Sequence, residues 1–334
     1  MPQSQPQKIA ELSPEQRALR QQGLGASEVA AVLGLDPFKT ALDVFLEKTG
    51  QAEPLPENRF MRWGKRLEAV IADEYQANHP DELVSETGTT VGRELWMLAT
   101  PDRIVVQHVK RATPAGWDHS EGRPAQQVVP HPVAQTLAIE RWGLECKSRG
   151  HYNATAWGES GTDEVPHAVA VQCHWGMAVT GLKRWDVAVL LGGNDYREYT
   201  LRADGNIAQE LVTRAREFWQ WYVLAKVHPP FTGAPSDHGF LLRTYPGHTS
   251  EIVTATPEVG EWANALQVAR ETIEAQEKEK SRLEARIKEF IADRLGVAGP
   301  FGRITWKHMD PVEVAAFTRK SHRRFNVQFT KGGD

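Results

Sequence analysis

The segment Leu144-Glu145-Cys146-Lys147 constrains the fold more than any other, because charged and apolar residues alternate along it. A period of two is that of a β-strand, with Glu145 and Lys147 on one face and Cys146 on the other. Burying an acid and a lysine costs free energy unless the two are paired or have a function. The pattern therefore predicts a strand with an apolar core on one face and a charged pair on the other.

The hydrophobic pattern along the rest of the chain alternates between helical and strand periods. It predicts helices that begin at Ser13-Pro14 and at Asp36-Pro37 (to Gly50), and over 27–33, 58–78, 165–181, 204–228 and 257–295. It predicts strands over 96–106 (interrupted at 100–103), 139–146, 185–191 and 196–201. A long loop at 108–136, a strand or linker at 236–255 and a small β-hairpin cap at 301–330 complete the prediction. The organisation expected is a core over 1–235 and an appendage over 236–334, whose charged helix is typical of a helical hairpin or coiled-coil arm.

Composition excludes several classes of protein. The chain of 334 residues is 40% hydrophobic and 25% charged, as is ordinary for a globular protein. It has no apolar run long enough to span a membrane and no apolar segment near its N-terminus, so we expect neither a membrane protein nor a secreted one. Two cysteines cannot form a disulfide framework, and we expect a reducing, cytoplasmic setting.

The net charge of −4 does not decide whether the protein binds nucleic acid. Residues 301–334 hold seven Lys/Arg and three Asp/Glu, a local charge of +4, so the rest of the chain sums to −8. A protein that binds phosphate backbones concentrates positive charge locally. A solvated basic tail and a nucleic-acid contact both remain open for this segment.

Three residues form the strongest candidate site. Asp102 follows Pro101 at the edge of the first strand, where pairing of the strands would bring it beside Glu145. Two converging carboxylates bind a hard cation such as Mg²⁺, which takes one or two protein carboxylates and leaves the rest of its sphere to water and phosphate. Lys147 beside the metal would activate a water or neutralise charge in the transition state. The alternative is a surface Glu–Lys pair, since Glu-x-Lys is common.

Three further features could contribute to the same site, and each has a plainer alternative. Glu68 on the predicted helix 58–78 could add a metal ligand, or pair with Lys65 on the helix surface. Arg20 with Ser27, in Gly25-Ala26-Ser27-Glu28, could hold an anion at a helix N-terminus, although N-capping by Ser27 is commoner. Gln172 on the predicted helix 165–181 could position water or phosphate, or be a partly buried polar residue. No glycine-rich phosphate loop, Cys/His zinc spacing or Gly-x-Ser-x-Gly elbow competes with this set.

Taken together and in order, these segments resemble the YqaJ viral recombinase family, the lambda-type exonuclease group of the PD-(D/E)xK nucleases. The resemblance covers roughly residues 15–230. The matching segments are Arg20 with Gly25–Glu28, Trp63-Gly64-Lys65-Arg66-Leu67-Glu68, Thr100-Pro101-Asp102, Leu144-Glu145-Cys146-Lys147, and Val171-Gln172 with Met177–Gly181.

The resemblance implies an α/β fold, in which helices flank a central mixed β-sheet in a restriction-endonuclease-like core. It implies Mg²⁺-dependent hydrolysis of DNA, with Mn²⁺ as a substitute and two ions in the site. Asp102, Glu145 and the Cys146 backbone carbonyl would hold the first ion and Glu68 would help to bind the second. Lys147 would activate the water and Gln172 would assist at the scissile group.

The resemblance also implies a substrate and partners. Arg20 and Ser27 would hold the terminal 5′-phosphate of a double-stranded DNA end. Digestion from 5′ to 3′ would leave a 3′ strand for a single-strand annealing protein, in a phage or prophage setting, and some members of the family form ring trimers. The chain departs from the family pattern in two places. The loop 108–136 is longer than the short turn expected between the two catalytic strands, and the C-terminal appendage puts the simple ring trimer in doubt. The alternatives are an endonuclease on the same scaffold and a non-catalytic protein that binds DNA or recruits a partner through 257–295.

Overall fold

The structure, a computed structural model, describes residues 14–52, 58–112 and 135–308. The chain divides into two compact units, one up to His238 and one from Gly239 onward. The first unit holds the central sheet and all the candidate site residues, and the second holds a long helix and a small hairpin.

A mixed five-stranded sheet forms the centre of the first unit, with the strand order β1-β4-β5-β6-β7. These strands are β1 (Glu82–Ser85), β4 (Arg103–Ala112), β5 (Gln135–Arg149), β6 (Arg184–Leu191) and β7 (Asp195–Arg202). The pair β5–β6 is parallel and its neighbours are antiparallel. Helix α5 (His167–Thr180) connects β5 to β6, as a parallel pair requires a crossover.

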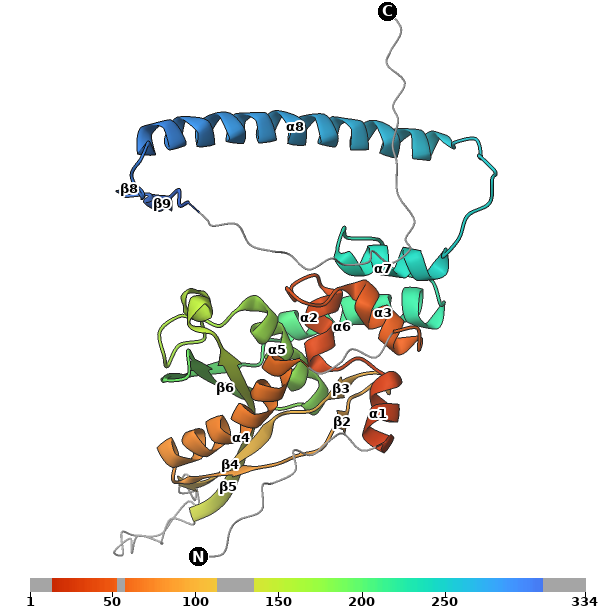
Figure 1. Cartoon of the computed structure of the whole chain (residues 1–334). Coiled ribbons are helices and arrows are strands. Elements are labelled where there is room, and N and C mark those ends of the chain that lie inside the picture. Colours follow the sequence, from red (N-terminus) through yellow and green to blue (C-terminus); the bar gives the residue numbers. More distant parts are fainter. Residues whose placement is uncertain (1–13, 53–57, 113–134, 309–334) are drawn as a thin grey trace, which may run out of the picture. The chain divides into compact units, whose positions relative to one another are not determined.

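Helices cover both faces of this sheet, and Figure 1 shows α4 (Arg59–Asn78) lying along β4 and β5. On the α4 face a cluster of buried side chains includes Ile71, Tyr75, Trp142, Leu144 and Cys146. On the α5 face a second cluster includes Val169, Cys173, Met177, Trp185 and Val187. The expected α/β architecture, a central mixed sheet flanked by helices, is therefore confirmed.

Four further helices complete this unit. They are α1 (Pro14–Gln21), α2 (Ala26–Val32), α3 (Ala41–Lys48) and α6 (Gly205–Phe218), which continues as a π-helix (Trp219–Leu224). Two of them, α2 and α6, pack against α5. A 3₁₀ turn (His151–Ala156) follows β5, and β2 (Thr90–Val91) pairs with β3 (Leu98–Ala99) in a separate small sheet.

Side-chain caps explain where two of the helices begin. Asn58 accepts hydrogen bonds from the backbone N–H groups of Phe60 and Met61 at the start of α4, and Asp204 accepts from those of Asn206 and Ile207 at the start of α6.

Several predicted boundaries were wrong. Helix α3 begins at Ala41 rather than at Asp36-Pro37, because Thr40 caps it while Asp36 accepts from the backbone of Phe38 and Lys39 in a turn. The single interrupted strand 96–106 is two strands, β3 and β4, in different sheets. The predicted loop 108–136 is shorter, since β4 runs to Ala112 and β5 starts at Gln135; residues 113–134 lie outside the described residues. A helix, α7 (Pro235–Thr244), occupies part of the segment expected to be a strand or linker.

The second unit contains the long helix α8 (Pro257–Ile291) and the antiparallel hairpin β8 (Gly296–Gly299) and β9 (Gly302–Thr305). Thr256 caps α8 and Pro257 occupies its first position. The helix ends at Ile291 rather than at the predicted residue 295. The hairpin lies earlier than the predicted cap at 301–330, of which the part from 309 lies outside the described residues. Among the described residues, none of the helices combines the length and apolarity that a membrane span requires.

Candidate active site

The first cluster of site residues forms where β4 begins beside the end of β5. Arg103 pairs with Leu144 across the two strands, which places Asp102 next to Glu145. The Asp102 carboxylate accepts a hydrogen bond of 2.8 Å from the backbone N–H of Cys146. The hydrogen-bonding pattern of the two strands therefore brings Asp102 to Glu145, as the sequence predicted.

Glu145, Lys147 and Gln172 form a closed triangle of hydrogen bonds on the α5 face of the sheet. Lys147 Nζ donates to Glu145 Oε1 over 2.5 Å and to Gln172 Oε1 over 3.0 Å. Gln172 Nε2 donates to the same Glu145 oxygen over 2.6 Å. Cys146 points the other way, into the cluster beneath α4. The strand alternation thus places the acid and the lysine on one face, and α5 supplies the amide that joins them.

The cluster contains two buried carboxylates, Asp102 and Glu145, whose negative charge Lys147 compensates only in part. Burial and the nearby Glu145 raise the pKa of Asp102 well above its usual range, although Lys147 and the Cys146 N–H act in the opposite direction. Burial alone would lower the pKa of Lys147, but Glu145 and Asp102 outweigh it and the net shift is upward. The glutamate itself is 3% exposed. Two carboxylates therefore share one buried lysine, and further positive charge there would be stabilised.

Glu68 reaches this region through a residue that the sequence analysis missed. It accepts a hydrogen bond of 3.0 Å from Arg103, whose guanidinium also donates to the Asp102 backbone carbonyl. The negative charge of Glu68 adds to those that raise the pKa of Asp102. The one feature of the sequence that could have indicated a role for Arg103 is its position directly after Asp102. Arg149 also continues the charged face of β5, two residues beyond Lys147.

The donor set fits a hydrated divalent cation better than a metal held entirely by side chains. Among the residues that the structure describes, no group of three His, Cys, Asp or Glu side chains is placed to hold a metal ion. Glu145 and Glu68 are each engaged by a cation of the protein, and both would have to turn to become ligands. The charge of Glu145 raises the pKa of Asp102, so a cation bound between the two carboxylates would relieve their repulsion. Mg²⁺ commonly takes only one or two carboxylate ligands from a protein and completes its coordination with water.

Arg20 and Ser27 lie apart from these hydrogen bonds. Both side chains are exposed, and within the described residues no hydrogen bond joins either of them to Asp102, Glu145, Lys147 or Gln172. The N-cap of α2 is Gly25, whose N–H donates to Glu28 over 2.7 Å, so the capping role considered for Ser27 is wrong. Their segment is tied to the site through Leu24, which bridges to Met97 just before β3.

A buried polar network supports β5 and β6 from the α4 face and was also missed. Asp186 is 3% exposed and accepts from the Tyr75 hydroxyl at 2.6 Å, from Arg184 at 2.8 and 2.6 Å, and from Thr200 at 2.8 Å. Trp142 donates to the same Tyr75 hydroxyl, and Arg184 lies over the Trp142 ring. This network fixes the strands that carry Glu145, but nothing in the local sequence links residues so far apart.

The mixed sheet, with its cluster of carboxylates and a lysine between the strand ends and α5, defines an α/β protein with a charged, partly buried candidate site. The sequence matches the YqaJ-like viral recombinase domain over residues 16–183, and the chain belongs to that family.

The individual relatives share only a small part of their sequence with this chain. The chain is 24% identical to the protein YqaJ of Bacillus subtilis (strain 168) over 294 residues, which cover 86% of this chain and 81% of that protein. Among solved structures, it is similar to the alkaline exonuclease LHK-Exo of Laribacter hongkongensis, solved alone and in complex with dAMP. That likeness covers 70% of this chain and 97% of the other, at 16% identity and a TM-score of 0.42.

Proposed function

We propose that this protein is a Mg²⁺-dependent deoxyribonuclease that digests double-stranded DNA from its ends, from 5′ to 3′, and leaves 3′ single strands for recombination. The observation that carries the proposal is the convergence of Asp102, Glu145, Lys147 and Gln172 in one cluster of a viral recombinase-like domain. Carboxylates beside a lysine suit phosphodiester hydrolysis, because both the attacking water and the departing oxygen need charge stabilisation.

The proposal divides the site residues into those that would bind the ions and those that position them. Asp102, Glu145 and the Cys146 backbone carbonyl would hold the first ion, and Glu68 would help to hold the second after leaving Arg103. Divalent cations in this position, Mg²⁺ or in its place Mn²⁺, supply Lewis-acid stabilisation of the developing charge. Gln172 holds Glu145 and Lys147 in position through its amide.

Lys147 has two candidate tasks that differ in its protonation state. Its raised pKa makes it an ammonium group in the structure described, which suits stabilisation of the transition-state charge. Activation of water requires the neutral amine, and cations on the neighbouring carboxylates would lower the pKa in that direction. The first task follows from the present geometry, and the second depends on the ions.

Arg20 and Ser27 are proposed to bind the terminal 5′-phosphate, on the strength of the family resemblance. Their exposure leaves both side chains free for a ligand from solution. A single-strand annealing protein as partner, and assembly of the core into a homo-oligomer such as a trimer, belong to the same proposal.

The test uses linear duplex DNA with labelled 5′-phosphate ends beside a covalently closed circle, each with and without Mg²⁺. Mg²⁺-dependent release of 5′ mononucleotides from the linear DNA alone is the expected result. Cutting of the circle would replace the exonuclease with an endonuclease on the same scaffold. Binding of DNA without hydrolysis in the presence of Mg²⁺ would refute the catalytic proposal and favour a recruiting role.

A further inference from the structure

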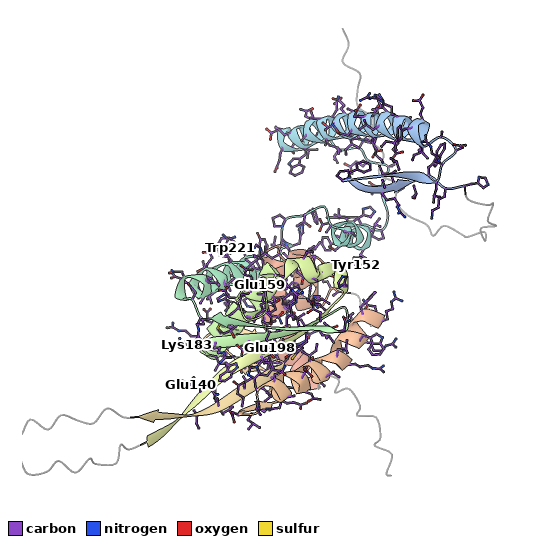
Figure 2. The ribbon with its side chains drawn as sticks, turned by 90° about the vertical axis from the view of Figure 1, so that its left-hand side faces the viewer. Glu140, Tyr152, Glu159, Lys183, Glu198 and Trp221 are labelled. Carbon is purple, nitrogen blue, oxygen red and sulfur yellow. The ribbon has the colours of Figure 1, made fainter. Side chains whose placement is uncertain are left out.

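The long helix α8 presents an unusually large unpartnered surface within its own unit. Of its 35 residues only Ile291 is buried. Large apolar side chains along it stay open to solvent, including Trp262 at 61%, Ile273 at 63% and Phe290 at 63% exposure. Figure 2 shows the side chains of α8 projecting from the helix, with the hairpin β8–β9 alongside. In proteins most helical stability comes from packing of the apolar side, so we expect the apolar side of this helix, which is about 50 Å long, to have a partner.

The apolar side of α8 follows a heptad pattern rather than the broader stripe of a helix on a globular core. Steps of three and four residues alternate along the whole helix, as the a and d positions of a coiled coil do. In the N-terminal half these positions hold Val259, Trp262, Leu266, Ala269 and Ile273. In the C-terminal half they hold Gln276, Lys280, Leu283, Ile287 and Phe290. A pattern sustained over more than four heptads is that of a coiled-coil strand.

One of the two polar positions, Lys280, indicates the direction of the partner. In a parallel pair of identical helices, Lys280 would face the partner's Lys280 inside the seam, which buries two like charges. In an antiparallel pair with full overlap, Lys280 faces the partner's Ala269, which leaves room for its stem to reach solvent. Trp262 then faces the partner's Ile287, and large residues meet apolar neighbours at both ends.

The charges beside the seam select the same arrangement. In the antiparallel pair, Arg270 lies across from the partner's Glu277, which also pairs with Lys280 of its own helix at 3.0 Å, and symmetry provides the Arg270–Glu277 contact twice. In the parallel pair, the flanking positions would instead place Glu279 against the partner's Glu284, also twice. Flanking charges set the orientation of coiled coils, so a second antiparallel copy is favoured over a parallel one.

At the C-terminal end of α8, the hairpin and the a and d side chains of the helix together form a groove. This mainly apolar groove of about 400 Å³ is lined by Leu283, Arg286, Ile287 and Phe290 of the helix and by Val297, Phe301 and Ile304 of the hairpin. In the antiparallel pair the N-terminal turns of the partner, with its Trp262, lie over this groove. A large aromatic side chain that enters an apolar groove is the usual centre of a protein–protein interface.

We infer that α8 is a self-association helix: two copies of this chain pair through α8 in an antiparallel coiled coil, with Trp262 of each seated in the α8–hairpin groove of the other. The inference is independent of the catalytic proposal, because every residue that carries it lies in the second unit.

The test measures the mass of the full-length protein in solution, by light scattering or sedimentation, for wild type and two charge reversals. Arg270→Glu makes the flanking contacts Glu–Glu, and Glu277→Arg makes them Arg–Arg. Each variant alone should therefore have half the mass of the wild-type assembly. An equimolar mixture should regain the wild-type mass, because both contacts in the mixed pair are again between opposite charges.

Recovery in the mixture cannot come from misfolded variants, so the design remains decisive if either helix is weakened. Lys278→Glu is the matched control for Arg270→Glu: it makes the same change of charge on the outer face of α8, where Lys278 bonds only Glu274 of its own helix among the described pairs, and the mass should not change. Trp262→Ala should also halve the mass. Wild-type mass in both reversals, or no recovery on mixing, would overturn the inference and assign the apolar side of α8 to another partner.

Discussion

Replacing Lys147 by methionine tests the electrostatics of the candidate site without reference to DNA. Methionine keeps the unbranched stem and removes the only side-chain cation that is hydrogen-bonded to Glu145 among the described residues. Glu145 then keeps one donor, Gln172 Nε2 at 2.6 Å, and Asp102 keeps the Cys146 N–H at 2.8 Å. Two buried carboxylates are left with hydrogen bonds but without a neutralising charge.

The expected loss of stability follows from the burial of the pair. Removing one partner of a buried ion pair costs about 3–5 kcal/mol. The side chains of Lys147 and Glu145 are 15% and 4% exposed, so screening by water is small. Because Gln172 still donates to Glu145, we expect the lower end, about 3 kcal/mol. For a unit of this size that corresponds to a fall in Tm of roughly 6–12 °C.

The loss should depend on pH. The pKa of Asp102 is raised in the folded protein, so between its unfolded and folded pKa values the native state binds more protons than the unfolded chain. Its contribution to the free energy of unfolding therefore falls as the pH rises through this window. Without Lys147 the folded pKa rises further. The deficit of the variant should be largest near pH 8 and should shrink towards pH 5.

The assay is urea unfolding of wild type and Lys147→Met at about pH 8 and about pH 5, with and without Mg²⁺. Mg²⁺ should restore more stability to the variant than to the wild type, because it replaces the missing positive charge. A deficit below about 1 kcal/mol at the higher pH, or one that is equal at both pH values, would refute the electrostatic account of the cluster.

Three further predictions follow from the geometry. Tyr75→Phe should cost about 2 kcal/mol in urea unfolding, because it removes one hydrogen bond to the buried carboxylate of Asp186, and no measurable loss would contradict that bond. Gly176→Ala should destabilise by about 1–3 kcal/mol, since the new Cβ would lie 2.4 Å from the Trp185 ring, whereas Gly64→Ala, with open space around it, should not; equal effects would reject the packing argument. Arg20→Ala should remove mainly the preference for 5′-phosphorylated over 5′-hydroxyl ends in digestion rates, and an unchanged preference would reject its phosphate-binding role.

The core of the site was predictable because it depends on strand geometry. Alternation alone placed Glu145 and Lys147 on one face, and antiparallel pairing with the preceding strand brought Asp102 to them. The same periodic argument gave α4, α5 and the β6–β7 hairpin within a few residues. These features follow from local periods and adjacent pairing, which a single sequence carries.

Contacts between distant segments were not predictable from the same signals. Nothing near Glu68 indicates that Arg103 bonds it, and nothing near Tyr75 points to Asp186, 111 residues away. A helical stripe also shows which side is apolar but not whether anything covers it. Trp63 of α4 is 55% exposed, because the sheet covers only the part of the helix around Ile71.

The segment 236–244 shows a third limit. Its residues have weak amphipathic character, so a strand or linker was predicted where the structure has α7. Asp237 is buried and accepts from the backbone N–H of Thr232 and Gly233, which fixes the turn before the helix. The local hydrogen bonds of one aspartate outweigh the hydrophobic pattern at this position.

The most direct measurement of the central claim compares Glu145→Gln with the wild type on a 5′-phosphorylated linear duplex in Mg²⁺, following nucleotide release and DNA binding in the same samples. Glutamine keeps the size of the side chain and its hydrogen-bonding oxygen but removes the charge that a cation needs. The account predicts that the wild type releases 5′ mononucleotides while the variant binds the duplex as tightly and releases none. Hydrolysis at the wild-type rate by the variant would contradict the assignment of this cluster as the active site.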